Sequence, residues 1–242
     1  MRTQIPENAV SHDYIRVLDE FVALLLDRQR ENLVCALLSG SYARGEATEE
    51  SDLDVYCVFQ RITVDVLTDV GFCARNTSVS YEELEINTQC LGMDEFCCSD
   101  FASWSERSVK ILDGVFLYGD DIYGSEVSTA ELRGIYTNHL VDILMTIRHY
   151  ISVDEPAEKL PYTKVKANIL KPLMFALQLE RYCTKGAFPL TLQELEDALE
   201  ERGKRIVALL RDERLYAKRV AEDHRAVLHD LHVLICEKLG CA

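Results

Sequence analysis

Two short motifs hold the residues best suited to chemistry, and the first is Gly40-Ser41, which follows an apolar run. A Gly-Ser turn between a strand and a helix presents backbone N–H groups and a hydroxyl, which together favour a phosphate. Gly40 permits close approach, Ser41 adds a donor, and Gly45 lets the following segment pass close to a nucleotide. Arg44 is either a further phosphate ligand or a solvated charge of the turn. This motif predicts a site for a phosphate-bearing ligand.

The second motif is a pair of carboxylates, Asp52 and Asp54, at the head of another apolar run. Residues two apart on a strand project to the same side, so both aspartates can bind hard divalent cations through oxygen. Two such cations can clamp the attacking and leaving oxygens of an in-line phosphoryl displacement. The pair therefore predicts metal-dependent chemistry on phosphate. The alternative is a surface turn with a capping aspartate.

The elements that position these motifs follow from the hydrophobic pattern. Short continuous apolar runs indicate buried strands, and alternation indicates a strand with one exposed face. The expected elements of the first half are a helix ending near Arg30, strands at 33–38, 53–59, 79–91 and 115–118, a short helix followed by a loop at 76–78, and a helix at 99–112. This alternation of strands and helices indicates a mixed sheet with helices.

The second half has a different pattern, because no strand signal follows Tyr123. Capping boxes at 128–131 and 191–194 predict two helix starts. Amphipathic patterns predict a helix at 163–185, which Pro172 kinks or begins, and one further helix at 212–239.

We therefore expect an α+β fold. An N-terminal domain at residues 1–125 should hold the sheet and both motifs, and residues 126–242 should form an all-α helical bundle. No internal repeat is visible.

Charge narrows the choice of partners. The chain carries a formal net charge of −15, and residues 1–125 contain 23 acidic and 9 basic residues, against 18 and 17 in residues 126–242. An acidic field repels long polyanions, so we expect no nucleic-acid partner, and it suits divalent cations and a cationic acceptor. Residues 1–10 show no apolar h-region, no uncharged run approaches membrane-spanning length, and the nine cysteines include no Cys-x-x-Cys pair. A cytoplasmic protein with reduced thiols and no membrane partner is expected.

The two motifs together resemble the signature of the DNA polymerase β-like nucleotidyltransferase superfamily. That signature is Gly-Ser, a short gap, Gly, a polar loop, and two aspartates in alternation with apolar residues, which here is residues 40–45 and 51–55. The one departure is Ser51, a polar residue at the first apolar position. The resemblance covers about residues 30–120, and with the helical second half the chain is similar to bacterial antibiotic nucleotidyltransferases of the aminoglycoside type.

This resemblance implies a third carboxylate on a neighbouring strand, and Glu85, between Leu84 and Ile86, matches it, with Glu83 as the alternative. Asp52, Asp54 and Glu85 would then bind Mg²⁺, with Glu85 as third ligand or as general base.

The implied reaction is transfer of AMP from ATP to a hydroxyl of a small acceptor, with release of pyrophosphate. Gly40, Ser41, Arg44 and Gly45 would contact the nucleotide. Two alternatives stay open: an antitoxin-type enzyme that adds AMP to a partner protein, and a non-catalytic nucleotide-binding regulator. The resemblance is also compatible with a homodimer.

One further pattern lies in the helical half. Arg219 and His224 match the loose Arg-x4-His spacing of HEPN ribonucleases, although a spacing of this kind arises readily by chance. The sequence leaves open whether this pair has any role.

Overall fold

The computed structural model describes residues 4–10, 13–81, 84–97, 114–119, 122 and 129–241. Glu83 and the helix expected at 99–112 lie outside these residues. The chain divides into two compact units, Met1–Glu126 and Val127–Ala242. No helix in the described ranges is long and apolar enough to cross a membrane.

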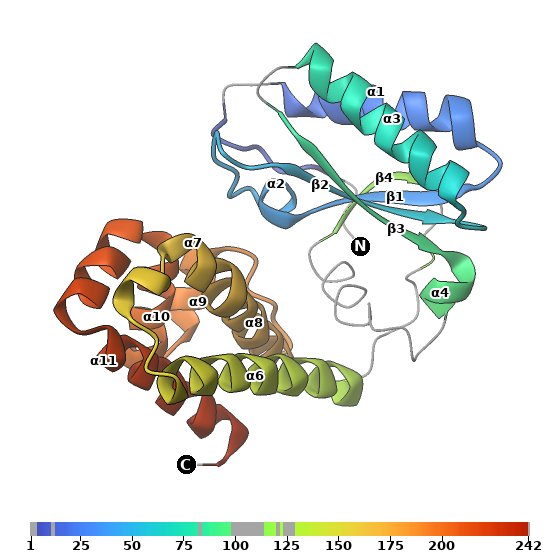
Figure 1. The fold of residues 1–242 in the computed structure, drawn as a ribbon. Helices are drawn as coiled ribbons and strands as arrows, with labels where there is room; N and C mark the ends of the chain where they lie inside the picture. The colour runs from blue at the N-terminus through green and yellow to red at the C-terminus, as the bar shows by residue number, and fades with distance from the viewer. Residues whose placement is uncertain are drawn as a thin grey trace. The chain divides into compact units, whose positions relative to one another are not determined.

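The first unit is a mixed four-stranded sheet with helices (Figure 1). Its elements, in chain order, are α1 (Tyr14–Gln29), β1 (Leu33–Ser39), α2 (Gly40–Arg44), β2 (Leu53–Phe59), α3 (Val64–Ser80), β3 (Ile86–Gly92), α4 (Met93–Cys97) and β4 (Val115–Gly119). The strand order is β3-β2-β1-β4, with β1 antiparallel to both β2 and β4 and β2 parallel to β3. The expected mixed sheet is confirmed.

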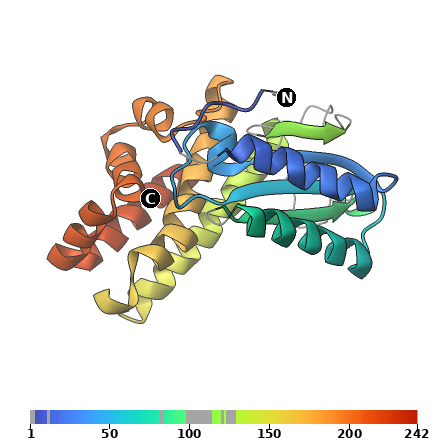
Figure 2. The ribbon, with the colours of Figure 1, turned by 90° about the horizontal axis from the view of Figure 1, so that it is seen from above.

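The two faces of this sheet have different coverings. Helices α1 and α3 lie side by side on one face (Figures 1 and 2), where Leu53, Val55 and Cys57 of β2 are buried among their apolar side chains. The alternate β2 residues Tyr56 and Val58 belong to a smaller cluster on the other face. Because side chains alternate along a strand, Asp54 lies on the face of the smaller cluster.

The segment before β3 differs from expectation. The predicted loop at 76–78 lies within α3, and β3 begins at Ile86 rather than at Val79. The polar residues of this segment bond back to their own helix: Asn76 Nδ2 donates to the Phe72 carbonyl at 2.7 Å and Ser80 Oγ donates to the Asn76 carbonyl at 3.2 Å. Such bonds satisfy side chains that otherwise favour turns, so the helix continues.

Among its described residues, 129–241, the second unit contains helices and connecting loops but no strand, as expected. Its elements are α6 (Thr129–Ser152), η1 (Ala157–Lys159), α7 (Tyr162–Val165), η2 (Lys166–Leu170), α8 (Lys171–Lys185), α9 (Leu192–Ala198), α10 (Glu201–Arg211) and α11 (Glu213–Leu239). The predicted capping box of α9 is present, with the Thr191 side chain accepting from the Glu194 N–H at 3.1 Å.

Two helices of this unit are less regular than their sequence patterns predict. The helix expected from 163 to 185 contains a π-helical turn, η2, which runs directly into α8. Pro172 is the second residue of α8, and because a proline donates no backbone hydrogen bond it interrupts the helical ladder next to the π-turn. The helix expected at 212–239 is broken at Asp223, whose φ of −163° and ψ of 93° are extended. Asp223 Oδ1 accepts from the Ala226 N–H at 3.0 Å and so caps the second part of α11.

Candidate active site

The Gly-Ser turn and the aspartate pair meet where β1 ends and β2 begins. Ser39 pairs with Asp54 across the antiparallel strands, and its hydroxyl donates to the Asp54 carbonyl at 3.4 Å. Gly40 follows with a φ of +75°, and a Cβ built on it would lie 3.2 Å from Asp54 Cγ and closer still to Oδ2. The Asp54 carboxylate therefore occupies the space beside the turn that any other residue at position 40 would need.

The neighbouring strand adds an amide to this carboxylate. In the parallel register of β2 and β3, Asp54 is opposite Asn87, and Asn87 Nδ2 donates to Asp54 Oδ1 at 3.0 Å. This bond fixes one carboxylate oxygen and leaves Oδ2 beside Gly40. The sequence patterns gave Asn87 no role.

Glu85 and Asp52 lie just before the two parallel strands. The Leu53 N–H donates to the Glu85 carbonyl at 2.8 Å, which holds the two segments together. Leu84 and Ile86 are buried, whereas the Glu85 and Asp52 side chains are exposed. Alternation therefore directs both carboxylates to the same face as Asp54.

These carboxylates suit a hard divalent cation, for which carboxylate oxygens are preferred ligands. Asp54 Oδ2 adjoins the Gly40 turn, and Asp52 and Glu85 are accessible on the same face. As the side chains stand, no three His, Cys, Asp or Glu groups of the described residues are close enough together to hold a metal ion. The binding of a cation by Asp52, Asp54 and Glu85, with Glu85 as third ligand or base, therefore stays a prediction.

Arg44 is directed toward a carboxylate of its own loop. Its Nε lies 3.4 Å from Glu46 Oε2, and only 9% of its side chain is exposed. The interpretation of Arg44 as a solvated turn charge is therefore wrong. A guanidinium has five N–H donors, so the contact of Nε with Glu46 does not exclude the predicted contact of Arg44 with phosphate.

The N-terminal segment braces the turn, which the sequence did not reveal. Asn8 Nδ2 lies 3.1 Å from the Tyr42 carbonyl, and Asn8 Oδ1 accepts from the Ala47 N–H at 3.0 Å. Gly45 has a φ of +78°, and a Cβ there would lie 3.4 Å from the Glu7 carbonyl oxygen. A Cβ would meet the N-terminal segment at ordinary van der Waals distance, so the positive φ is what favours glycine at position 45. Its predicted contact with a nucleotide stays a prediction.

The buried side chain of Tyr42 fixes the turn to the core of the first unit. Its side chain is fully buried, and its ring packs against Tyr14 with centroids 4.9 Å apart. Burial, with the negative charges of Glu49 and Asp52 nearby, raises the pKa of the Tyr42 phenol to about 12. The neutral phenol is therefore a structural group.

The helical unit does not bring together the Arg-x4-His pair. Arg219 forms an ion pair with Asp230 at 3.7 Å and lines a cavity between α10 and α11. His224, beyond the break at Asp223, lines a different pocket around Tyr216. Arg219 and His224 therefore face different pockets.

The region that holds the two motifs matches a known protein family. Residues 22–85, which include both motifs and end at Glu85, match the model of the nucleotidyltransferase domain family. No curated protein sequence matches the chain significantly. Among solved structures, spectinomycin adenyltransferase AAD(9) from Enterococcus faecialis, determined with ATP and spectinomycin, is similar with a TM-score of 0.54 and 10% identity.

That similarity covers 90% of this chain and 98% of the spectinomycin adenyltransferase chain, so it extends over the α+β unit and the helical unit together. At this level of identity it establishes a shared fold. Residues 22–85 thus form a nucleotidyltransferase domain of the polymerase β-like type, in an enzyme of the nucleotidyltransferase class whose fold resembles that of antibiotic nucleotidyltransferases.

Proposed function

We propose that the protein transfers AMP from ATP to a hydroxyl of a small acceptor, with Mg²⁺ as cofactor and pyrophosphate as second product. The observation that carries this proposal is the packing of the Asp54 carboxylate directly against Gly40. A phosphate bound at the Gly40-Ser41 turn would lie next to that carboxylate. The family match of residues 22–85 and the ATP in the structurally similar spectinomycin adenyltransferase support the choice of chemistry.

Each site residue has a role in this proposal. Gly40 and Ser41 bind phosphate oxygens through the backbone N–H and the hydroxyl. Asp52 and Asp54 hold Mg²⁺, which when bound neutralises charge on the triphosphate. Asn87 orients Asp54 through its 3.0 Å hydrogen bond. Arg44, at the end of α2, adds a positive charge close to the turn.

The acceptor hydroxyl attacks the α-phosphorus, the bond from that phosphorus to the bridging oxygen breaks, and pyrophosphate leaves with the bonding electrons. The proton of the hydroxyl passes to the Glu85 carboxylate, which is exposed and can be reached by an acceptor. Most of the acceleration comes from holding the reactants in line, since the protein forms no covalent bond.

We assign transfer to the domain at residues 1–125 and acceptor recognition to the helical domain at residues 126–242. The excess of acidic residues in the first domain favours a cationic acceptor such as an aminoglycoside, because opposite charge raises the local concentration of the acceptor.

The test is a transfer assay with α-³²P-labelled ATP and Mg²⁺, offered aminoglycosides, lincosamides and cell-lysate protein in separate reactions. We expect label on a small molecule and stoichiometric pyrophosphate. Label on a protein band would instead support the protein-modifying alternative. Nucleotide binding without pyrophosphate release across all acceptors would support the non-catalytic regulator.

The variant Asp54→Asn tests the role of the Asp54 carboxylate in transfer. It removes one charge at the turn and should abolish transfer while leaving the thermal unfolding midpoint nearly unchanged. Asp19→Asn, an exposed aspartate of α1, is the control for loss of one negative charge. Full transfer by Asp54→Asn would contradict the proposed mechanism.

A further inference from the structure

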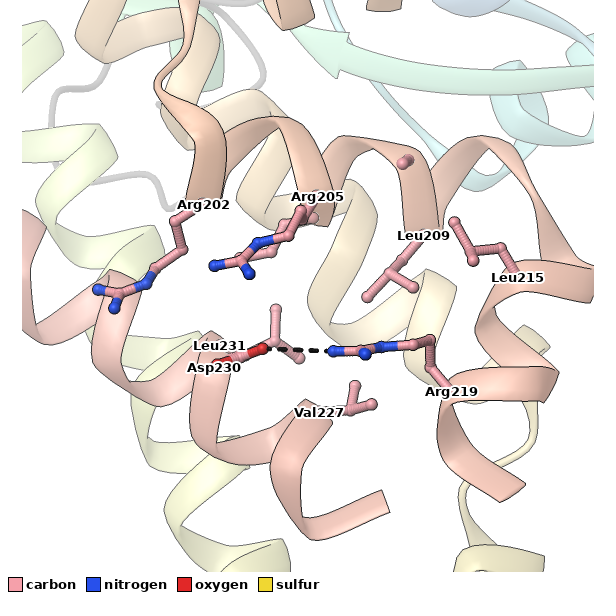
Figure 3. Close-up of a pocket in the computed structure, with 10 residues that line it drawn as sticks. Arg202, Arg205, Leu209, Leu215, Arg219, Val227, Asp230 and Leu231 are labelled. Atoms are coloured by element: carbon pink, nitrogen blue, oxygen red, sulfur yellow. Dashed lines mark ion pairs between the residues drawn. The ribbon is translucent and has the colours of Figure 1, made fainter. Parts of the chain in front are cut away.

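A cavity of about 230 Å³ lies between α10 and the two parts of α11 (Figure 3). The break at Asp223 creates it, because the two parts of α11 diverge there and α10 faces both. Its walls are mainly apolar, with Ile206 and Leu209 from α10, Leu215 from the first part of α11, and Val227 and Leu231 from the second.

The charged groups around this cavity are mostly arginines. Figure 3 shows Arg219 directed at Asp230, while Arg202 and Arg205 project side by side from α10. Arg202 pairs with Glu237, which is outside the lining, and Arg219 pairs with Asp230 at 3.7 Å. Arg205 has no ion-pair partner among the residues that the structure describes.

We propose that this cavity binds a small organic anion, with its apolar body between α10 and α11 and its head group on Arg205. An apolar cavity of ~150 Å³ is enough for benzene, so about 230 Å³ accommodates a substituted ring or a short branched chain. A planar guanidinium binds a carboxylate or a phosphate through two parallel hydrogen bonds.

Charge complementarity supports an anion over a neutral ligand. Because Arg202 is paired with Glu237 and Arg219 with Asp230, Arg205 gives the lining one uncompensated positive charge, although the net charge of the chain is −15. Arg219 and Asp230 are 44% and 40% exposed, so water screens their ion pair and an incoming anion can compete for Arg219. The site therefore offers one guanidinium at once and a second after exchange.

This site is lined entirely by the helical unit and uses none of the residues assigned to adenylyl transfer. Its test is a binding measurement, so its failure would leave the transfer proposal unaffected, and the reverse also holds.

The experiment titrates the full-length protein with 2-phenylacetate, phenyl phosphate and the neutral 2-phenylacetamide, followed by calorimetry and by ligand-observed NMR. We expect at least one anion to bind about tenfold or more tightly than the amide, because a charge-assisted hydrogen bond replaces a neutral one. Which anion binds more tightly identifies the head group. Equal binding of all three would overturn the anion requirement, and binding of none would overturn the site.

Two variants and one control variant test where the ligand binds. Arg205→Met keeps an unbranched side chain and removes the charge, and it should weaken anion binding about tenfold or more. Lys204→Met, at a neighbouring position outside the lining, should bind like the parent. Ala208→Leu adds volume at the wall and should weaken all three probes together. If Arg205→Met and Ala208→Leu both bind like the parent with an unchanged unfolding midpoint, the assignment is wrong.

Discussion

The backbone of Gly40 and the side chain of Asp54 share one space, so the site depends on a missing Cβ. Gly40→Ala would bring Cβ into the Asp54 carboxylate at a φ of +75°. We expect transfer activity to fall by about a hundredfold or more, because a displaced carboxylate can no longer adjoin the bound phosphate. The measurement is the labelled-ATP assay combined with urea unfolding.

Gly186→Ala is the matched control for this change. Gly186 also has a positive φ, 69°, but a Cβ there meets nothing within 4 Å. Both variants should lose about 1–2 kcal/mol of unfolding free energy from backbone strain, and only Gly40→Ala should lose transfer. Equal activity of the two variants would show that the contact with Asp54 is unimportant.

Asn87 is a positioning residue for the cation site. Asn87→Ala removes the amide that donates to Asp54 Oδ1 at 3.0 Å. Outer partners of metal ligands typically contribute about 10- to 100-fold to metal affinity or activity, so the Mg²⁺ concentration for half-maximal transfer should rise about tenfold. An unchanged Mg²⁺ requirement would indicate that Asp54 is held by other groups.

At the scale of elements, the N-terminal segment is the least expected support of the site. Asn8 joins Pro6, Tyr14, the carbonyl of Tyr42 and the N–H of Ala47 within 3.2 Å. It thereby ties the turn after β1 to the loop before β2.

Asn8→Ala should lower the free energy of unfolding by about 1–3 kcal/mol, because it leaves partly buried backbone groups without their partners. Asn8→Asp retains the acceptor for the Ala47 N–H but loses the donor. Its free energy of unfolding, measured by urea denaturation, should therefore lie between those of the parent and of Asn8→Ala. No loss in either variant would mean that water replaces these bonds at no cost.

Helices and strands were predicted correctly where the signal that forms them lies within a few residues of the sequence. The strands at 33–38 and 53–59 and the capping box of α9 were predicted, because apolar runs and caps act within a few residues. The extension of α3 through Ser80 and the break of α11 at Asp223 were missed. In both places polar side chains bond to nearby backbone, and the same residue types are equally compatible with a turn or a helix.

For the whole molecule, the burial of two tyrosines makes the free energy of unfolding depend on pH in the alkaline range. The pKa values of Tyr42 and Tyr216 are both raised to about 12 by burial. Up to about pH 10 the phenols are neutral in both states; between pH 10 and 12 the unfolded chain loses their protons and the folded chain retains them. The free energy of unfolding should therefore fall over this range, by at most about 2–3 kcal/mol for each phenol.

Urea unfolding at pH 9 and pH 11.5 checks this prediction. Tyr42→Phe lacks one of the two phenols, so its free energy of unfolding should fall less between these pH values than that of the parent. An equal fall in both proteins would show that Tyr42 ionises with its unfolded pKa.

The sequence by itself determined the fold class and the chemical type of the site. Gly40, Ser41, Asp52 and Asp54 are close in the chain, and two adjacent strands joined by a short loop bring them together in almost any arrangement. The acidic character of the first half was equally a matter of composition alone.

Only the tertiary structure decided what surrounds those residues. The parallel register of β2 and β3 placed Asn87 on Asp54, and the N-terminal segment placed Asn8 on the turn. The cavity between α10 and α11 likewise depends on how the two parts of α11 diverge. These contacts join residues from separate elements, and register and packing across a fold leave no local pattern in the sequence.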